Sequence, residues 1–328
     1  MPIITVSNVS KDYKIYKTEK GFVNSLKSIF SRNFEIKNAV NNISLSIEKG
    51  ELVGYIGSNG AGKSTTIKML CGILLPTSGE ILVNNLIPYK NRQQNALHIG
   101  VVFGQRSQLY WDLPMEETFD LYKKMYRIDE LQFKRNLEFY IELLNMKEFL
   151  RTPVRQLSLG QKMRANLAGA LLHDPEIVYL DEPTIGLDVF AKSRIREFLR
   201  EINKEKKTTI LLTTHDMHDI EQICSRIIMI DKGKILYDGS LKQFKSVHSK
   251  GMQILVADFE NKEIVINDKR LNLIKQEESR KWILFDKEQI NAVEAINILT
   301  QDNQLIDLNL TSPDIEEIVK NFYDESYK

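Results

Sequence analysis

Cysteine is nearly absent from this chain, and so are long hydrophobic runs. Among the 328 residues only Cys71 and Cys224 are cysteines, too few for a disulfide framework or a thiolate metal site. We interpret them as small buried residues in a reducing compartment. No window approaches the roughly 18 to 20 uninterrupted apolar residues that cross a bilayer, and residues 1–5 lack the charged lead and hydrophobic segment of a secretion signal. These absences predict a chain without a membrane span of its own.

An excess of either charge is missing as well. The chain has 45 basic and 44 acidic residues, which does not suggest a nucleic-acid-binding stripe. The two parts of the chain differ in net charge. Residues 241–328 contain 12 basic and 16 acidic residues, and residues 1–240 carry the compensating positive excess. The sequence pattern changes near the same point, and an apolar content of 42% is sufficient for two cores. We therefore predict two domains, residues 1–240 and 241–328.

The most informative feature that is present is a glycine-rich loop. It follows the apolar run of residues 52–56, precedes a helix-forming stretch, and reads Gly57-Ser58-Asn59-Gly60-Ala61-Gly62-Lys63-Ser64. Glycines in such a loop let backbone N–H groups turn inward around phosphates, and the following helix directs the positive end of its dipole at the same charge. The pattern predicts a nucleoside triphosphate site, with Lys63 reaching the β- and γ-phosphates and Ser64 holding Mg²⁺.

Two adjacent carboxylates follow a second apolar run. Residues 177–180 are continuously apolar and end in Asp181-Glu182-Pro183, as expected of a buried strand whose carboxyl end faces the nucleotide. Asp181 is suited to orient Mg²⁺, and Glu182 to polarise a water for in-line attack on the γ-phosphorus.

A third motif lies between these two strands. Leu157-Ser158-Leu159-Gly160-Gln161 precedes a strongly helix-forming run, so Ser158 and Gly160 occupy a helix N-terminus. Such a terminus offers free N–H donors and a hydroxyl to a γ-phosphate. Taken alone, the pentapeptide would also be explained by an ordinary N-cap.

The order of these motifs resembles the ATP-binding subunit of an ABC transporter along the whole nucleotide domain. The remaining parts of that pattern are present too: Thr65 after the phosphate loop, Gln105 in a glutamine loop, Gly186-Leu187-Asp188 as a dimer-contact loop, and His215 as a switch histidine after the apolar strand 209–212. The resemblance implies ATP and Mg²⁺ as cofactors, with Gln105 sensing Mg²⁺ and the attacking water, and His215 contacting the γ-phosphate.

The resemblance also assigns the adenine contact and the assembly. Tyr13 matches the aromatic position that stacks on adenine; Tyr16 is the alternative, and a merely packed strand tyrosine is also open. The signature residues Ser158, Gly160 and Gln161 of one chain are expected to close on the phosphate loop of another, with ATP between them. A homodimer would contain two competent sites, and a heterodimer with a second ATPase is left open.

Two positions depart from the commonest family pattern. Leu159 replaces the second of two glycines in the signature, and Ile185 precedes the dimer-contact loop where small residues are usual. Neither change removes a catalytic group. Both also occur in the subfamily of type-2 exporters that the chain resembles, so we expect catalysis to survive.

The predicted fold class is therefore α/β: a P-loop ABC ATPase domain with a helical subdomain, followed by a small α+β accessory domain. The predicted activity is ATP hydrolysis by the nucleotide-binding subunit of a drug-resistance or polysaccharide-type exporter. Membrane permease subunits would be its partners, at the cytoplasmic side of the cell membrane. The alternative is a soluble ABC-type ATPase with a regulatory or signalling role.

Two segments of the predicted ATPase domain carry further hypotheses. Residues 105–156 form the predicted helical subdomain, which by the resemblance docks the permease. Its candidate contact surface is Trp111-Asp112-Leu113-Pro114 and its surroundings; the alternative is that Tyr110 and Trp111 pack the subdomain core. Residues 17–37 contain apolar residues at helical spacing among basic ones, which indicates a basic amphipathic helix that lies against permease or lipid, or packs on the ATPase core.

The accessory domain shows no catalytic pattern. We expect strands at residues 253–258, 262–266 and 282–285, and helices near residues 289–299 and 314–323. Dimerisation or regulation is favoured over ligand sensing as its role.

Overall fold

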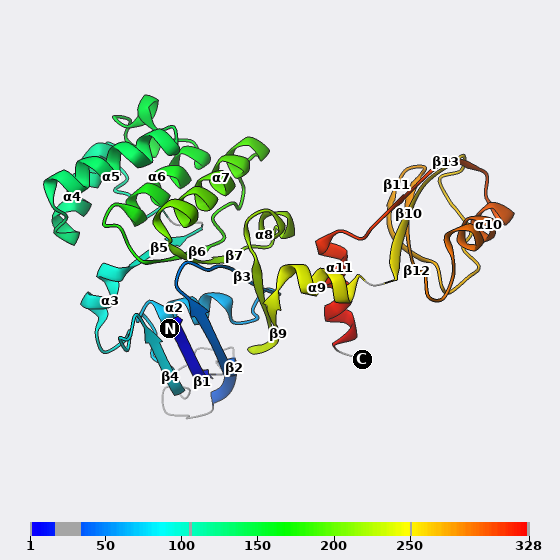
Figure 1. Ribbon diagram of the computed structural model, residues 1–328, viewed down its shortest axis with the longest axis horizontal. Helices are drawn as coiled ribbons and strands as arrows, with labels where there is room; N and C mark the ends of the chain where they lie inside the picture. The colour runs from blue at the N-terminus through cyan, green and yellow to red at the C-terminus, as the bar shows by residue number, and fades with distance from the viewer. Residues whose placement is uncertain (1, 17–33, 105–106, 250, 327–328) are drawn as a thin grey trace, which may run out of the picture. The chain divides into compact units, whose positions relative to one another are not determined.

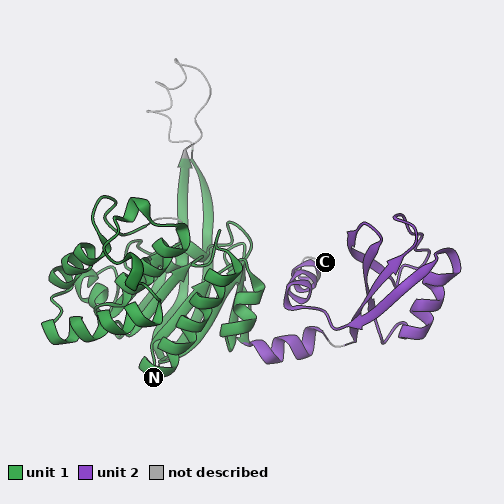
Figure 2. Ribbon diagram, turned by 90° about the horizontal axis from the view of Figure 1, so that it is seen from above, with its two compact units in different colours: residues 1–239 green, residues 240–328 purple. Residues whose placement is uncertain are grey.

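The computed structural model describes residues 2–16, 34–104, 107–249 and 251–326. The chain divides into two compact units, Met1–Gly239 (unit 1) and Ser240–Lys328 (unit 2), coloured green and purple in Figure 2. Gln105 lies outside the described residues, as do residues 17–33 of the predicted basic helix. No helix within the described ranges is both long enough and apolar enough for a bilayer crossing.

A six-stranded sheet with the order β5-β6-β7-β3-β8-β9 forms the centre of unit 1 (Figure 1). Its strands are β3 (Leu52–Gly57), β5 (Ile99–Phe103), β6 (Ile177–Asp181), β7 (Thr209–Thr213), β8 (Arg226–Asp231) and β9 (Lys234–Ser240). The strands from β5 to β8 in this order are parallel. Central parallel strands are buried on both faces, which explains the continuous apolar runs of β3, β6 and β7. Their carboxyl ends share one edge, so the loops that follow them converge there.

A second, antiparallel sheet has the order β2-β1-β4. It consists of β1 (Pro2–Tyr16), β2 (Phe34–Glu48) and β4 (Ser78–Val83). Its apolar side chains share one core with α2 and the six-stranded sheet, in which Val6, Ile43, Tyr55 and Ile67 are almost completely buried. The far ends of β1 and β2 stay paired as far as Tyr16 and Phe34 and extend as a two-stranded ribbon (Figure 2).

The helix predicted over residues 17–37 is wrong for residues 34–37. These residues begin strand β2, where Phe34, Ile36 and Lys37 are paired with Tyr16, Lys14 and Tyr13 of β1. The helical spacing of apolar residues is a local signal, whereas strand pairing depends on partners about 20 residues away. Pairing prevails here because β-structure responds mainly to cross-strand neighbours.

The helices of unit 1 fall into two groups. Around the sheets lie α2 (Lys63–Leu70), α3 (Arg92–His98), α7 (Val189–Lys206) and α8 (Met217–Ile223). The helical subdomain contains α4 (Met115–Tyr126), α5 (Glu130–Leu143), the 3-10 turns η1 (Lys147–Phe149) and η2 (Val154–Gln156), and α6 (Leu159–Leu171). Helix α6 contacts α4, α5 and strand β5, and thereby joins this subdomain to the sheet.

Unit 2 is built on a four-stranded antiparallel sheet with the order β11-β12-β10-β13. Its elements are α9 (Leu241–His248), β10 (Met252–Phe259), β11 (Asn272–Glu277), β12 (Arg280–Asp286), α10 (Ala292–Asp302), β13 (Leu305–Thr311) and α11 (Ile315–Glu325). Leu255, Phe259, Phe285 and Leu299 belong to its core. Strands β10 and β12 and helices α10 and α11 match predicted elements, although α10 begins three residues later than expected.

The strand predicted at residues 262–266 is wrong, because this segment obtains its hydrogen bonds from side chains. Asn303 bonds both backbone groups of Val265: its Oδ1 accepts from the N–H and its Nδ2 donates to the carbonyl, each at 2.8 Å. The buried ammonium of Lys281 donates to the Lys262 carbonyl at 2.6 Å. With these groups satisfied, the segment packs Ile264 and Ile266 on the core without joining the sheet.

Candidate active site

The glycine-rich loop occupies the turn between strand β3 and helix α2. Gly62, the N-cap of α2, has φ of 114°, and a Cβ there would come within 2.5 Å of the Ala39 carbonyl oxygen. A Cβ on Gly57 would lie 2.1 Å from the Ile230 carbonyl oxygen. Both positions therefore require glycine, for backbone conformation at one and for close approach to β8 at the other.

Polar side chains fix the same loop from two sides. The Ser58 hydroxyl donates to the Asp231 carboxylate at the end of β8. The Lys63 ammonium donates to the carbonyls of Gly57, at 2.6 Å, and Ser58, at 3.1 Å. Lys63 is 7% exposed; burial lowers its pKa, and the carboxylates of Glu182 and Asp181 oppose that shift. The lysine is thus a buried cation held at the mouth of the loop.

Oxygen donors meet where β6 and β7 end. Asp181 accepts from the Ser64 hydroxyl through Oδ2, at 2.9 Å, and from the Thr213 hydroxyl through Oδ1, at 2.6 Å. A serine hydroxyl and a carboxylate are ligands that Mg²⁺ prefers. The side chains of Ser64 and Asp181 therefore fit the metal that the sequence predicts.

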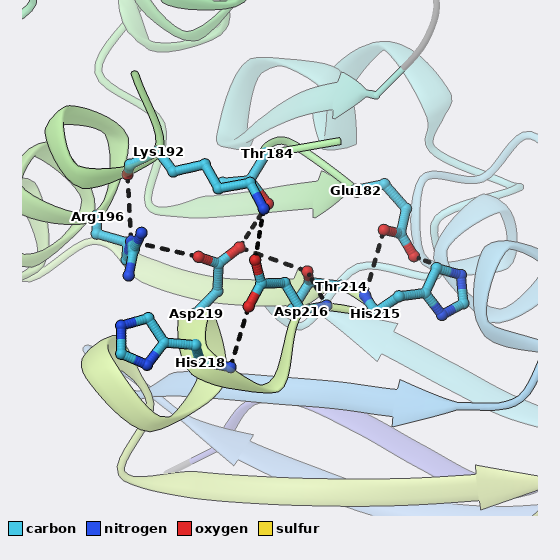
Figure 3. Close-up of polar contacts among 9 residues, drawn as sticks. All are labelled: Glu182, Thr184, Lys192, Arg196, Thr214, His215, Asp216, His218 and Asp219. Atoms are coloured by element: carbon cyan, nitrogen blue, oxygen red, sulfur yellow. Dashed lines mark hydrogen bonds and ion pairs between the residues drawn. The ribbon is translucent and has the colours of Figure 1, made fainter. Parts of the chain in front are cut away.

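Glu182 sits in a strained backbone position beside His215. Its φ of 60° is in the left-handed region, which bulky L-residues seldom adopt. One carboxylate oxygen accepts from the His215 backbone N–H at 3.3 Å, and the other lies 3.0 Å from Nε2 of the same residue (Figure 3). Burial raises the pKa of Glu182, while His215 and Lys63 act in the opposite direction. Such a poised carboxylate is suited to accept a proton.

One cavity of about 670 Å³ gathers most of these groups, a volume in the range of small-molecule sites. The residues lining it are Tyr13, Lys14, Ile15, Lys37, Ala39, Asn59, Gly60, Ala61, Gly62, Lys63, Ser64, Thr65, Asp181, Glu182 and His215. Of the residues predicted for the site, Gly57 and Ser58 shape the loop behind this lining.

The signature residues lie elsewhere in unit 1. Ser158 is the N-cap of α6 and forms a capping box with Gln161. A Cβ on Gly160 would contact Ala191 at 3.4 Å, and Leu159, half exposed, lies beside Gly186. None of Ser158, Gly160 and Gln161 lines the cavity. Within one chain the signature therefore borders the loop of residues 186–188 and is separate from the phosphate loop.

The sequence predicted only Tyr13 from the β1–β2 side of the cavity. Lys14, Ile15, Lys37 and Ala39 also line it, and Lys37 is paired directly with Tyr13 across the two strands. The extended pairing of β1 with β2 brings these residues to the site, and no local motif marks it. Tyr16, the alternative adenine contact, is not among the lining residues.

Comparison with known proteins gives one family. Residues 40–185 match the family model described as ABC transporter. The ABC transporter ATP-binding protein NatA of Bacillus subtilis is 35% identical over 216 residues, 65% of this chain and 87% of NatA. The bacitracin transport ATP-binding protein BcrA of Bacillus licheniformis is 29% identical over 273 residues, 83% of this chain and 88% of BcrA.

A solved structure has the same fold as most of the chain. It is the dimeric ATP-binding cassette MJ0796 in a post-hydrolysis state, bound to ADP and Pi. The alignment has a TM-score of 0.60 at 27% identity and covers 73% of this chain and 98% of that one.

Proposed function

Because this chain belongs to the ABC transporter family of ATP-binding proteins and is an ATPase of that family, we propose that it drives an exporter through separate membrane permease subunits. It would do so from the cytoplasmic side of the membrane, by ATP-dependent closure of a dimer. The observation that carries the dimer proposal is the separation of the signature from the cavity within one chain. BcrA is a bacitracin transport ATP-binding protein, and this similarity supports a drug-like cargo.

In the proposed mechanism the groups around the cavity have different roles. Lys63 binds the β- and γ-phosphates, and the loop N–H groups surround them. Ser64 and Asp181, together with Gln105, would hold Mg²⁺, which neutralises charge on the phosphates. Glu182 accepts the proton of the attacking water, and His215 orients Glu182 and contacts the γ-phosphate. The signature residues Ser158, Gly160 and Gln161 of a second chain complete the site.

We propose a groove beside the helical subdomain as the permease contact. It has a volume of about 390 Å³ and is lined by apolar and aromatic side chains that include Ile73, Tyr110, Tyr122 and Met125. Trp111 is 58% exposed and Tyr110 is 47% exposed, so the interpretation that they pack the subdomain core is wrong. Exposed aromatic and Met side chains around a groove are typical of protein-binding sites.

Replacing Met125 with Glu should separate permease binding from ATP hydrolysis. Met125 is 64% exposed and lines the groove but not the cavity, so the ATPase activity of the isolated chain should stay within about twofold. A charge in an apolar groove should abolish copurification of a polytopic partner in mild detergent.

The matched control for this experiment is Leu131→Glu. Leu131 is 79% exposed on α5 and does not line the groove, so the partner should still copurify. Retention of the partner by Met125→Glu would refute the proposed groove. If the wild type hydrolyses ATP with soluble partners alone, the soluble signalling function replaces the exporter function.

Replacing Tyr13 with Ala should weaken ATP binding by about tenfold, since base stacking on an aromatic ring contributes roughly 1–3 kcal/mol. Tyr13→Phe keeps the ring and should bind normally. Isothermal titration with a non-hydrolysable ATP analogue measures both, and inorganic triphosphate, which has no base, should bind equally to all variants. The control is Tyr16→Ala, which lies outside the cavity. Loss of affinity in Tyr16→Ala alone would transfer the adenine contact to that residue.

For unit 2 we propose support of the dimer or regulation. The described residues of unit 2 form a hydrophobic core of their own. No group of three metal-ligating side chains occurs in the part of the chain that the structure describes. The proposed domains remain residues 1–240 for nucleotide hydrolysis and residues 241–328 for this accessory role.

A further inference from the structure

A cluster of four buried polar side chains lies beside Glu182 and His215 (Figure 3): Thr184, Arg196, Thr214 and Asp219. The turns that carry these two residues leave the neighbouring strands β6 and β7. Two hydrogen bonds from main-chain N–H groups already tie the turns together: the Glu182 N–H donates to the Thr213 carbonyl at 3.0 Å, and the His215 N–H donates to the Glu182 carboxylate at 3.3 Å. A third link runs through Asp219 of helix α8.

Asp219 joins side chains from three elements. Its Oδ2 accepts from the Thr184 hydroxyl at 2.5 Å and lies 3.5 Å from the Thr214 hydroxyl. Thr184 is two residues beyond Glu182, and Thr214 immediately precedes His215. Arg196 of α7 places Nε 3.3 Å from the other oxygen, Oδ1. One carboxylate therefore contacts both catalytic turns and a helix.

Burial makes this arrangement rigid. Asp219 is 1% exposed, Thr184 4%, Thr214 2% and Arg196 9%. Water cannot readily replace a lost partner in such a place, so the Thr184 hydroxyl depends on Asp219 for its hydrogen bond, and the Asp219 and Arg196 charges depend on each other. Burial raises the pKa of Asp219, and the Thr184 hydrogen bond and the Arg196 charge oppose that rise.

Helix α7 connects the cluster to the loop of residues 186–188, which borders the signature residues. It begins after Asp188, its N-cap, at the loop proposed to contact the partner chain. Lys192 of α7 binds Asp216 at 2.6 Å, one residue after His215, and Arg196 binds Asp219 one turn later. A displacement of the start of α7 would thus be passed to the His215 turn through two ion pairs.

We propose that Asp219 is a positioning residue that holds the Glu182 and His215 turns in register and links both to helix α7. The inference rests on the proposed catalytic roles of Glu182 and His215. The expected kinetic effect of losing it is a lower kcat at unchanged ATP affinity, because Thr184, Arg196 and Asp219 do not line the cavity that contains the phosphate loop and Lys63.

The decisive test compares a single with a double variant. Asp219→Leu leaves Arg196 buried without its partner, so both the melting temperature and kcat should fall. Arg196→Met combined with Asp219→Leu removes the unpaired charge, and replacement of a buried ion pair by apolar side chains often restores stability. The melting temperature should then recover while kcat stays about ten- to a hundredfold low, since the turns are still misplaced.

Thr184 offers an independent measurement. Thr184→Val removes only the hydroxyl and should lower kcat, whereas Thr184→Ser keeps the hydroxyl and should retain the wild-type rate. The effects of Thr184→Val and Asp219→Leu on kcat should not add, because both remove the same contact. Affinity for a non-hydrolysable ATP analogue should stay within about twofold in every variant.

The matched control is Asp238→Asn, which removes one partner of Arg226 in another ion pair of unit 1, between β8 and β9. It should leave kcat unchanged. Recovery of kcat together with the melting temperature in the double variant would overturn the proposal and leave Asp219 a purely structural residue. Failure of the proposed function is distinguishable, because Glu182→Gln would then hydrolyse ATP at the wild-type rate.

Discussion

Replacement of Glu182 by Gln should reduce kcat for ATP by about a thousandfold, within the range that a positioned general base contributes. Glutamine has the shape of glutamate and can still accept the His215 N–H through its amide oxygen, but it cannot take a proton from water. ATP affinity should remain within about twofold, because Lys63 and the phosphate loop are unchanged. Steady-state hydrolysis and titration with ATP together separate the two effects.

The left-handed backbone at Glu182 makes the comparison specific. Its φ of 60° is set by the turn after β6, and Gln tolerates that conformation about as well as Glu, so the substitution should not shift the melting temperature. Glu176→Gln is the control: this carboxylate is also partly buried, but it pairs with Lys49 and Asn84 outside the cavity. An unaltered kcat in Glu182→Gln would mean that another group activates the water.

The parts of the site that could be predicted from the sequence are those formed by residues close together in the chain. A glycine-rich loop after a buried strand and two acids at the end of another need only local pattern and the rule that parallel strands end at one edge. The ABC ATPase fold class predicted in this way is confirmed. The roles of the individual site residues stay predictions.

Contacts between distant segments could not be predicted in the same way. Lys37 reaches the cavity because β2 pairs with β1 in a particular register, and Asp231 reaches Ser58 because β8 lies beside β3. Asp219 looks like an ordinary helix residue in the sequence. Its importance depends on which hydroxyls face it after folding, and no spacing rule encodes that.

Unit 2 shows the same limit for secondary structure. Strand β10 is rich in buried apolar residues and was predicted, whereas the edge strands β11 and β13 are mostly exposed and were missed. Exposed edge strands have a weak alternation signal, because only one of their sides meets the core. The segment of residues 262–266 has the alternation but lacks the pairing, since Asn303 and Lys281 bond its backbone instead.

Replacing Lys63 with Met should weaken ATP binding by about ten- to a hundredfold and bring hydrolysis to background, because hydrogen bonds to charged groups contribute roughly 1.5–3 kcal/mol each. Methionine has a similar length and fills the space, so the loss measures the ammonium. The Gly57 and Ser58 carbonyls also lose their donor, and a small decrease in melting temperature should accompany the loss. Lys90→Met, an exposed lysine outside the cavity, is the control.

The comparison of Lys63→Met with Glu182→Gln tests whether one residue serves ATP binding and the other ATP hydrolysis. The lysine variant should fail at binding, and the glutamine variant should bind ATP and fail at hydrolysis. Because the two side chains line one cavity and each charge opposes the burial shift in the pKa of the other, a small cross-effect is expected. A Lys63→Met chain that binds ATP with wild-type affinity would contradict the phosphate contact assigned to Lys63, whatever the Glu182 variant does.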